Sequence, residues 1–108
     1  MADQETPVLD VLGAMTAASL EATGLDAKTL LLVRFAALVA VDAPPASYLM
    51  HIAAGADAGL DEESARDVLT AIAPIVGTAR TVSAVGKIVR ALGVAIEIAG
   101  LEADEDEI

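Results

Sequence analysis

Residues 47–63 read SYLMHIAAGADAGLDEE, and they contain both the only histidine of the chain, His51, and the signals that decide the fold. The spacing of breakers predicts a helix that begins at Pro45 and stops at Gly59. Asp61 is a typical N-cap residue, and the two glutamates after it lie in a first turn, where the helix dipole favours negative charge. The stretch therefore predicts two helices joined by a glycine-containing turn.

Helix caps and breakers divide the remainder of the chain in the same way, and nothing in it predicts a strand. Thr6 beside a proline is typical of a helix start, and Asp26 and Thr78 are the expected caps of two later helices. Gly93 either ends the fifth helix or only weakens it. The expected helices span about 7–22, 27–41, 45–58, 62–73, 79–92 and 94–99. We therefore predict an all-α domain of about six helices over residues 1–100.

In the second half of the chain, we expect Pro74 and Gly77 to interrupt the helical structure between the fourth and fifth helices. Beyond residue 100, five acidic residues lie within residues 102–107. Their mutual repulsion and the scarcity of apolar residues predict a disordered tail over residues 101–108.

Two helices carry residues that indicate close contacts. Gly55 lies inside the helix of His51, where glycine costs about 1 kcal/mol relative to alanine, so we expect another group to pack against it. On the fifth helix, apolar residues recur at helical spacing and form a stripe: Val82, Val85, Val89 and Leu92.

The composition predicts a protein that associates with itself. Hydrophobic residues make up 56% of the 108 residues, and the mean hydropathy is +0.63. One small domain hides only part of its surface, and large apolar patches seldom stay uncovered. We therefore expect a homo-oligomer in which apolar surface of one copy is buried against another.

Charge, aromatic content and the absence of cysteine exclude several partners. The net charge is −11 and only 2% of residues are aromatic, so the chain should repel phosphate backbones and has few rings to stack on bases. The most apolar stretch, residues 30–41, is interrupted by Arg34 and is too short to span a membrane, and the N-terminus lacks a basic secretory start. We expect no nucleic acid, no membrane and a cytoplasmic location. Without cysteine there is no disulfide and no thiol metal site.

His51, the glycine at position 59, the acidic helix start after it and the run Ala73-Pro74-Ile75-Val76-Gly77 together resemble the carboxymuconolactone decarboxylase and alkylhydroperoxidase AhpD-like family. The resemblance covers roughly residues 25–93. It implies an all-helical domain that assembles as a trimer or hexamer. For the decarboxylase branch it also implies removal of CO2 from a lactone dicarboxylate, a lyase reaction that needs no metal and no organic cofactor.

The redox branch of this family uses the motif Cys-x-x-Cys-x-x-x-His and a glutamate on the preceding helix. Aligning the motif on His51 puts Pro44 and Ser47 at the cysteine positions, and the glutamate falls near Leu31 or Leu32. None of these residues can form the disulfide or replace the glutamate. We therefore predict no thiol peroxidase activity, and the decarboxylase branch is the better match.

Four residues form the expected site. His51 can take a proton near neutral pH, which makes it the expected proton-transfer residue. Tyr48 and Ser47 each lie about one turn earlier on the same helix, so the three side chains could line one pocket. Arg34 is a lone charge in an apolar helix and is the expected clamp for a substrate carboxylate. No residue is expected to bind a cofactor or a metal.

Each of these assignments has a structural alternative. His51 could be satisfied by a backbone carbonyl in the core or at a subunit contact. Arg34 could pair with Asp57 or Asp67, or reach to solvent. The remaining basic residues of the fifth helix are better ion-pair partners than substrate ligands: Arg80, Lys87 and Arg90.

The leading hypothesis is a carboxymuconolactone decarboxylase-like enzyme with cofactor-free acid/base chemistry on a small anionic organic acid or lactone. One alternative is a non-catalytic homo-oligomeric scaffold or interaction protein, and another is acid/base chemistry on a different small organic acid. A solvent-connected cavity beside His51, with a second polar group within hydrogen-bond reach, would favour an enzyme.

Overall fold

The computed structural model describes residues 6–55 and 58–106, and helices account for most of them. They occur in the order α1 (Pro7–Ala22), α2 (Ala27–Ala40), α3 (Pro45–Gly55), α4 (Glu62–Val76) and α5 (Thr78–Asp106). No strand occurs in this part of the chain, so the expected all-α fold is confirmed, with five helices where about six were expected. Over the same residues, none of the helices is both long enough and apolar enough to cross a bilayer. The cytoplasmic location stays a prediction.

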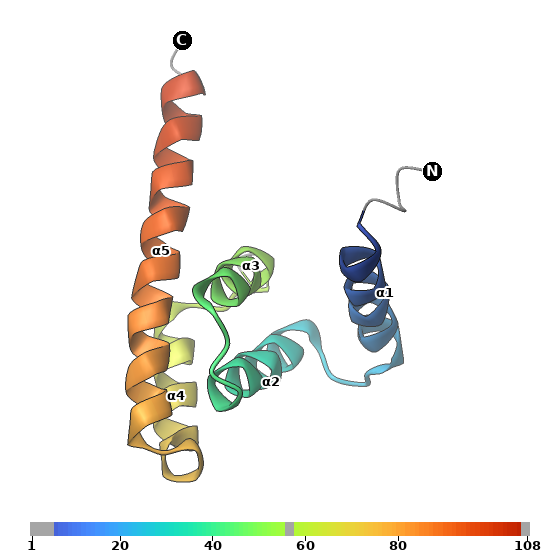
Figure 1. Cartoon of the computed structure of the whole chain (residues 1–108), viewed down its shortest axis with the longest axis vertical. Coiled ribbons are helices and arrows are strands. Elements are labelled where there is room, and N and C mark those ends of the chain that lie inside the picture. The colour runs from blue at the N-terminus through green and yellow to red at the C-terminus, as the bar shows by residue number, and fades with distance from the viewer. Residues whose placement is uncertain (1–5, 56–57, 107–108) are drawn as a thin grey trace.

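Helices α2, α3, α4 and α5 pack together, and α1 stands apart from them (Figure 1). α2 contacts the other three helices of this body, and α3 lies against α5. Burial at these contacts fixes the position of α3, and therefore of the histidine, relative to α2. The buried core where the helices meet consists of Phe35, Val39, Ala43, Tyr48, Ala84 and Ala91.

Two of the predicted caps start their helices as expected. One carboxylate oxygen of Asp26 accepts a hydrogen bond of 2.8 Å from the backbone N–H of Thr29, and Asp61 accepts one of 2.8 Å from Ser64. These bonds lower the pKa of both carboxyl groups, because they favour the ionised form. Thr6 lies at the N-cap position of α1 but makes no side-chain bond to the helix backbone there. The starts of α2 and α4 are therefore fixed by a side-chain capping bond, whereas the start of α1 is not.

α3 ends at Gly55 and not at Gly59, where the sequence predicts its end. The carbonyl of Gly55 accepts hydrogen bonds from the backbone N–H groups of Ala58, at 3.1 Å, and Leu60, at 3.0 Å, and these turn the chain earlier. Gly59 follows with a φ of 80°, which glycine adopts without strain. A Cβ at Gly55 would lie 2.8 Å from Cδ2 of Leu60, which confirms that another group packs against this glycine.

Two expected breaks do not end a helix. Pro74 lies inside α4, and beyond it the N–H of Gly77 still bonds the carbonyl of Ala73 at 3.0 Å, so the helix ends only at the turn where Gly77 has a φ of 90°. Gly93 lies inside α5, where an isolated glycine weakens a helix by about 1 kcal/mol without ending it. Of the two alternatives for Gly93, the one in which it does not end the fifth helix is confirmed, and residues 94–99 belong to α5.

α5 continues to Asp106, so residues 101–106 of the expected tail are helical. Leucine, alanine and glutamate are good helix formers, and this local preference outweighs the repulsion on which the expectation of disorder rested. The C-terminal part of α5 projects beyond the other helices (Figure 1). Residues 107–108 lie outside the described residues. The division into a domain over 1–100 and a tail over 101–108 stays a prediction.

Polar groups of α5 hold the end of α2. Asp42 follows that helix with a φ of 55°, and its Oδ1 accepts hydrogen bonds from Nζ of Lys87 at 2.9 Å and from Oγ of Ser83 at 2.8 Å. Arg80 donates a hydrogen bond to the carbonyl of Ala40. Cations are favourable at the C-terminal end of a helix, where the dipole is negative. Lys87 is thus confirmed as an ion-pair partner, whereas Arg80 binds a carbonyl.

Candidate functional site

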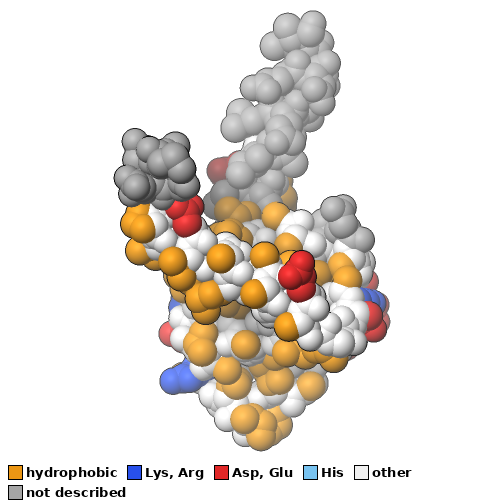
Figure 2. Space-filling model, turned by 90° about the vertical axis from the view of Figure 1, so that its right-hand side faces the viewer, with side chains coloured by type: hydrophobic (Ala, Val, Ile, Leu, Met, Phe, Trp, Pro, Cys, Tyr) orange, Lys and Arg blue, Asp and Glu red, His pale blue; other side chains and the backbone are white. Residues whose placement is uncertain are grey.

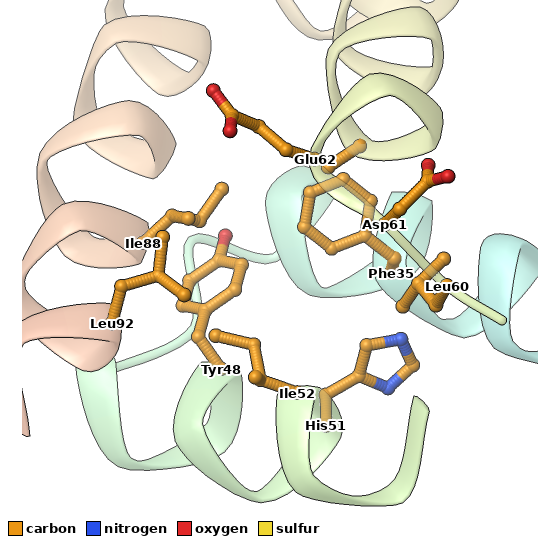
Figure 3. A pocket seen from close by; sticks show the side chains of 10 residues that line it. Phe35, Tyr48, His51, Ile52, Leu60, Asp61, Glu62, Ile88 and Leu92 are labelled. Carbon is orange, nitrogen blue, oxygen red and sulfur yellow. The ribbon is translucent and has the colours of Figure 1, made fainter. Parts of the chain in front are cut away.

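The chain has one phenylalanine, one tyrosine and one histidine, and the structure brings their rings together. Phe35 comes from α2, whereas Tyr48 and His51 come from successive turns of α3 (Figure 3). The ring of Phe35 meets Tyr48 edge-on, with centroids 6.1 Å apart and planes at 73°. It lies nearly parallel to His51, at 6.1 Å and 18°. Because Phe35 and Tyr48 are almost fully buried, these contacts hold the histidine ring at the junction of α2 and α3.

An apolar cavity of about 200 Å³, which we call the chamber, lies beside these rings. All four helices of the body and the turn before α4 contribute to it (Figure 3). Asp61 and Glu62 are the acidic groups of its lining. The apolar walls, Ile52, Leu60, Ile88 and Leu92, suit the hydrocarbon part of a small molecule.

A second and wider cavity of about 580 Å³, which we call the groove, lies between α1, α2 and α3. Its lining is largely apolar, with Arg34 as its basic group. Of the described residues, His51 alone lines both the groove and the chamber. The polar side chains of the groove are Thr16, Ser19, Arg34, Ser47 and His51.

The structure divides the four expected site residues between the two cavities. Arg34, Ser47 and His51 line the groove, and Tyr48 lines the chamber. The expectation that the three α3 side chains would line one pocket is therefore wrong. Consecutive residues of a helix point about 100° apart, and here Ser47 faces the groove whereas Tyr48 faces the chamber.

Two buried polar atoms, the hydroxyl oxygen of Tyr48 and Nε2 of His51, have no hydrogen-bond partner among the described residues. A buried polar group without a partner costs about 1–3 kcal/mol. Within the described part of one chain, Nε2 of His51 therefore has no backbone carbonyl as partner, and the structural alternative of a histidine satisfied by a backbone carbonyl in the core or at a subunit contact stays a prediction. A bound molecule that supplied a partner would remove this cost.

The surroundings of His51 set its charge. Burial lowers the pKa of the imidazole, a backbone hydrogen bond with Leu31 acts in the opposite direction, and the positive charge of Arg34 lowers the pKa further. The ring is therefore neutral at pH 7 and can accept a proton. Burial raises the pKa of Tyr48, and the charge of Asp42 raises it further, so the phenol keeps its proton.

Arg34 donates a hydrogen bond from Nη2 to Oγ of Ser19, at 2.9 Å. It belongs to neither of the ion pairs found within the described part of the chain. Of its two expected acidic partners, Asp67 is not paired with it, and Asp57 lies outside the described residues. The partner that the structure shows is a neutral hydroxyl, which leaves other N–H donors of the guanidinium for the groove.

Phe35 is the site residue that the sequence analysis missed. It contacts both rings of α3 from another helix, and nothing in local spacing indicates such a contact. The available signal was its rarity, because an isolated ring in a chain almost without rings is a candidate for a specific packing role. Within residues 6–55 and 58–106, no cluster of three or more histidine or acidic side chains could hold a metal ion.

These features define a cysteine-free, all-helical domain whose single histidine lies between an apolar chamber and a groove with one arginine. Residues 7–91 match the model of the carboxymuconolactone decarboxylase family, and the chain belongs to that family. The match extends further toward the N-terminus than the sequence resemblance does and includes α1. Curated proteins and solved structures gave no match to the chain.

Proposed function

We propose that the protein is a carboxymuconolactone decarboxylase-like enzyme that carries out cofactor-free acid/base chemistry on a small organic acid or lactone, with His51 as the proton-transfer residue. The observation that carries the proposal is the placement of His51, which lines both cavities and has Arg34 as a neighbour in the groove. A histidine that is neutral when the site is empty can gain a proton when an anion binds beside it.

Arg34 binds the carboxylate of the substrate in this proposal. Its planar guanidinium has five N–H donors, of which the bond to Ser19 uses one. A carboxylate can accept two of the others in a bidentate pair, and the hydroxyl of Ser47 lines the same groove. In a chain of net charge −11, a local cation is needed to bind an anion, and Arg34 supplies it.

The proton step follows from the charge balance of decarboxylation. When CO2 leaves a carboxylate, the bonding electron pair stays on the carbon, which then requires one proton. His51 takes up a proton from solvent as the anionic substrate binds, because a nearby anion favours the imidazolium. It delivers that proton to the carbon and returns to its neutral form, so each turnover consumes one proton. The hydrocarbon part of the substrate lies against the apolar lining of the cavities.

The test compares CO2 release from a lactone dicarboxylate and from a panel of small organic acids. His51→Gln should abolish turnover, because glutamine cannot carry a proton near pH 7, whereas Arg34→Gln should mainly raise KM. Arg66→Gln is the matched control, since Arg66 is exposed on α4 and pairs only weakly with Glu62. Absence of CO2 release by the unaltered protein across the panel, or full turnover by His51→Gln, would refute the proposal.

A non-catalytic homo-oligomeric scaffold is the second candidate, and a separate observation favours it. Large apolar side chains are exposed over α1 and along α5, as they would be if contacts between chains were the main task of the fold. A scaffold of this kind would show self-association without turnover. His51→Gln would then affect stability alone.

A further inference from the structure

The chamber differs from the other apolar surfaces of the molecule in what is buried beside it. Large apolar side chains are widely exposed, and Figure 2 shows hydrophobic side chains spread over the face that includes α1. Apolar area alone therefore does not mark a ligand site in this protein. The chamber combines apolar walls with the hydroxyl oxygen of Tyr48, which has no hydrogen-bond partner among the described residues. This combination is typical of a site for a small molecule.

The side chain of Tyr48 is held in place and directed into the chamber. The residue is only 1% exposed, and its ring meets that of Phe35 edge-on. Figure 3 shows the ring of Tyr48 extending from α3 into the space that the lining residues enclose, with the oxygen at its far end. Burial raises the pKa of the phenol, so the group remains a hydrogen-bond donor at neutral pH. A ligand oxygen that accepts this bond would give the hydroxyl the partner that it lacks within the described chain.

The charges around the chamber disfavour an anionic ligand. Asp61 and Glu62 line the chamber and are exposed at the start of α4, and the described lining contains no lysine or arginine. A carboxylate in the chamber would meet two like charges and would lose its hydration against apolar walls. Arg34, the residue that we propose binds a carboxylate, lines the groove. The two cavities therefore differ in the ligand charge that they accept.

The volume of the chamber limits the size of the ligand. An apolar cavity of about 150 Å³ is enough to bind benzene, and the chamber has a volume of about 200 Å³. A ring of this size therefore fits with room for small substituents. We propose that the chamber binds a small uncharged molecule with a single ring, and that Tyr48 donates a hydrogen bond to a hydroxyl or carbonyl oxygen of this molecule.

This inference goes beyond the proposed reaction and does not depend on it. The reaction requires an anion beside Arg34, whereas the ligand of the chamber is uncharged and is recognised by Tyr48. His51 lines both cavities, so a ligand in the chamber changes the surroundings of the ring to which we assign the proton transfer. Binding to the chamber is measured without turnover, and failure of one proposal therefore leaves the other standing.

NMR titrations of the carbon-13-labelled protein test the proposal, with p-cresol as the probe. The chain has one tyrosine, so the ring signals of Tyr48 need no assignment, and Tyr48 lines the chamber but not the groove. We expect p-cresol to shift these signals saturably. Benzoate and benzylammonium, which have a similar size but carry a charge, should bind more weakly to the chamber. The lack of a saturable shift with p-cresol, or equally tight binding of either ion, would overturn the proposal.

Tyr48→Phe removes the hydroxyl group and keeps the ring, so it isolates the proposed hydrogen bond. We expect p-cresol to bind about 3- to 10-fold more weakly to this variant, as followed through the ring signals of His51. Toluene, which has no oxygen, should bind both proteins equally. Thr70→Val is the control, because it removes a hydroxyl group that bonds a carbonyl of α4 and does not line the chamber. Unchanged binding of p-cresol, or an equal loss for toluene, would contradict the hydrogen bond.

Two further measurements separate a ligand site from a structural hydroxyl group. Because the hydroxyl has no partner among the described residues, Tyr48→Phe should leave the urea midpoint of the unliganded protein unchanged or raise it. A lower midpoint would show that the hydroxyl is already bound within the protein, against the proposal. Ala65→Leu fills the chamber and should abolish binding of both p-cresol and toluene, with unchanged helical circular dichroism. Unchanged binding in this variant would place the ligand elsewhere and overturn the proposal.

Discussion

Arg34 and Ser19 are joined by a hydrogen bond of 2.9 Å, and among the described residues this is the side-chain hydrogen bond that ties α1 to the body. The same guanidinium lines the groove in which we propose that a carboxylate binds. Arg34 therefore connects the position of a loosely held helix to the occupancy of the site.

Ser19→Ala should loosen α1 without unfolding the body. Ser19 is exposed, so we expect the free energy of unfolding to change by no more than about 0.5 kcal/mol. Amide hydrogen exchange of residues 7–22 should become faster, as measured by mass spectrometry. Thr16→Ala is the control, because Thr16 bonds only the carbonyl of Leu12 in its own helix. Equal exchange in the two variants would show that the bond to Arg34 does not hold α1.

The single histidine makes its own titration measurable by NMR. Because burial and Arg34 lower the pKa of His51, its ring protons should titrate below the usual value of about 6.5. A small carboxylate such as acetate or succinate should raise this pKa, since a bound anion favours the imidazolium. In Arg34→Gln the response to the carboxylate should disappear. A pKa that does not change with carboxylate would count against an anion site beside His51.

The lowered pKa of His51 also predicts how the stability of the protein depends on pH. The pKa of His51 is lower in the folded protein than in the unfolded chain, so between the two values the unfolded chain binds more protons. The free energy of unfolding should therefore be constant above about pH 7 and decrease as the pH falls from there toward the folded pKa. Urea titrations between pH 5 and 8 measure this slope, and His51→Gln should remove it. An equal slope in the variant would show that titratable groups other than His51 cause the pH dependence.

Gly55→Ala should destabilise the turn between α3 and α4. The new Cβ would lie 2.8 Å from Cδ2 and 3.0 Å from Cβ of Leu60, and overpacking of this kind costs about 1–3 kcal/mol. Leu60→Ala in the same chain should recover part of the loss, as measured by a double-mutant cycle in urea. The control is Gly93→Ala, at a helical position with free space, which should stabilise by about 0.5–1 kcal/mol. A neutral Gly55→Ala would contradict the close contact.

Removal of the residues after Gly100 should leave the body intact. The helical segment over residues 101–106 extends α5 past the other helices (Figure 1), and it contains four acidic residues whose mutual repulsion opposes compaction. We expect a melting temperature within a few degrees of that of the full chain in a calorimetric scan. A large decrease would show that this segment packs against the body or against a second copy.

The helix starts could be predicted because they depend on residues only three positions apart. Asp26 and Asp61 each bond a backbone N–H in the first turn of their own helix, and the identity of the capping residue indicates this locally. The apolar stripe of α5 was predictable for the same reason, since helical spacing alone defines it. The ends of helices were harder to predict: Pro74 did not end α4 as expected, and the sequence left open whether Gly93 ends a helix.

The sequence supplied the candidate site residues, but it predicted their arrangement only in part. Spacing placed Ser47, Tyr48 and His51 on one helix, but the packing of α2 and α5 determines which side chain faces which cavity. The contact of Phe35 with His51 and the bond of Arg34 to Ser19 join different helices. Contacts of this kind follow from tertiary packing and have no local pattern in a single sequence.

We expect the one-residue connection at Gly77 to influence the order in which the chain folds. α4 ends at Val76 and α5 begins at Thr78, so these two helices form a hairpin with almost no loop to close. Because loop closure is the main entropic barrier to early contacts, we expect this hairpin to form first, at a rate independent of protein concentration. α1 has no such local partner and, if a second copy covers it, becomes ordered last and at a rate that rises with concentration. Folding and assembly would then be separate kinetic phases of one short chain.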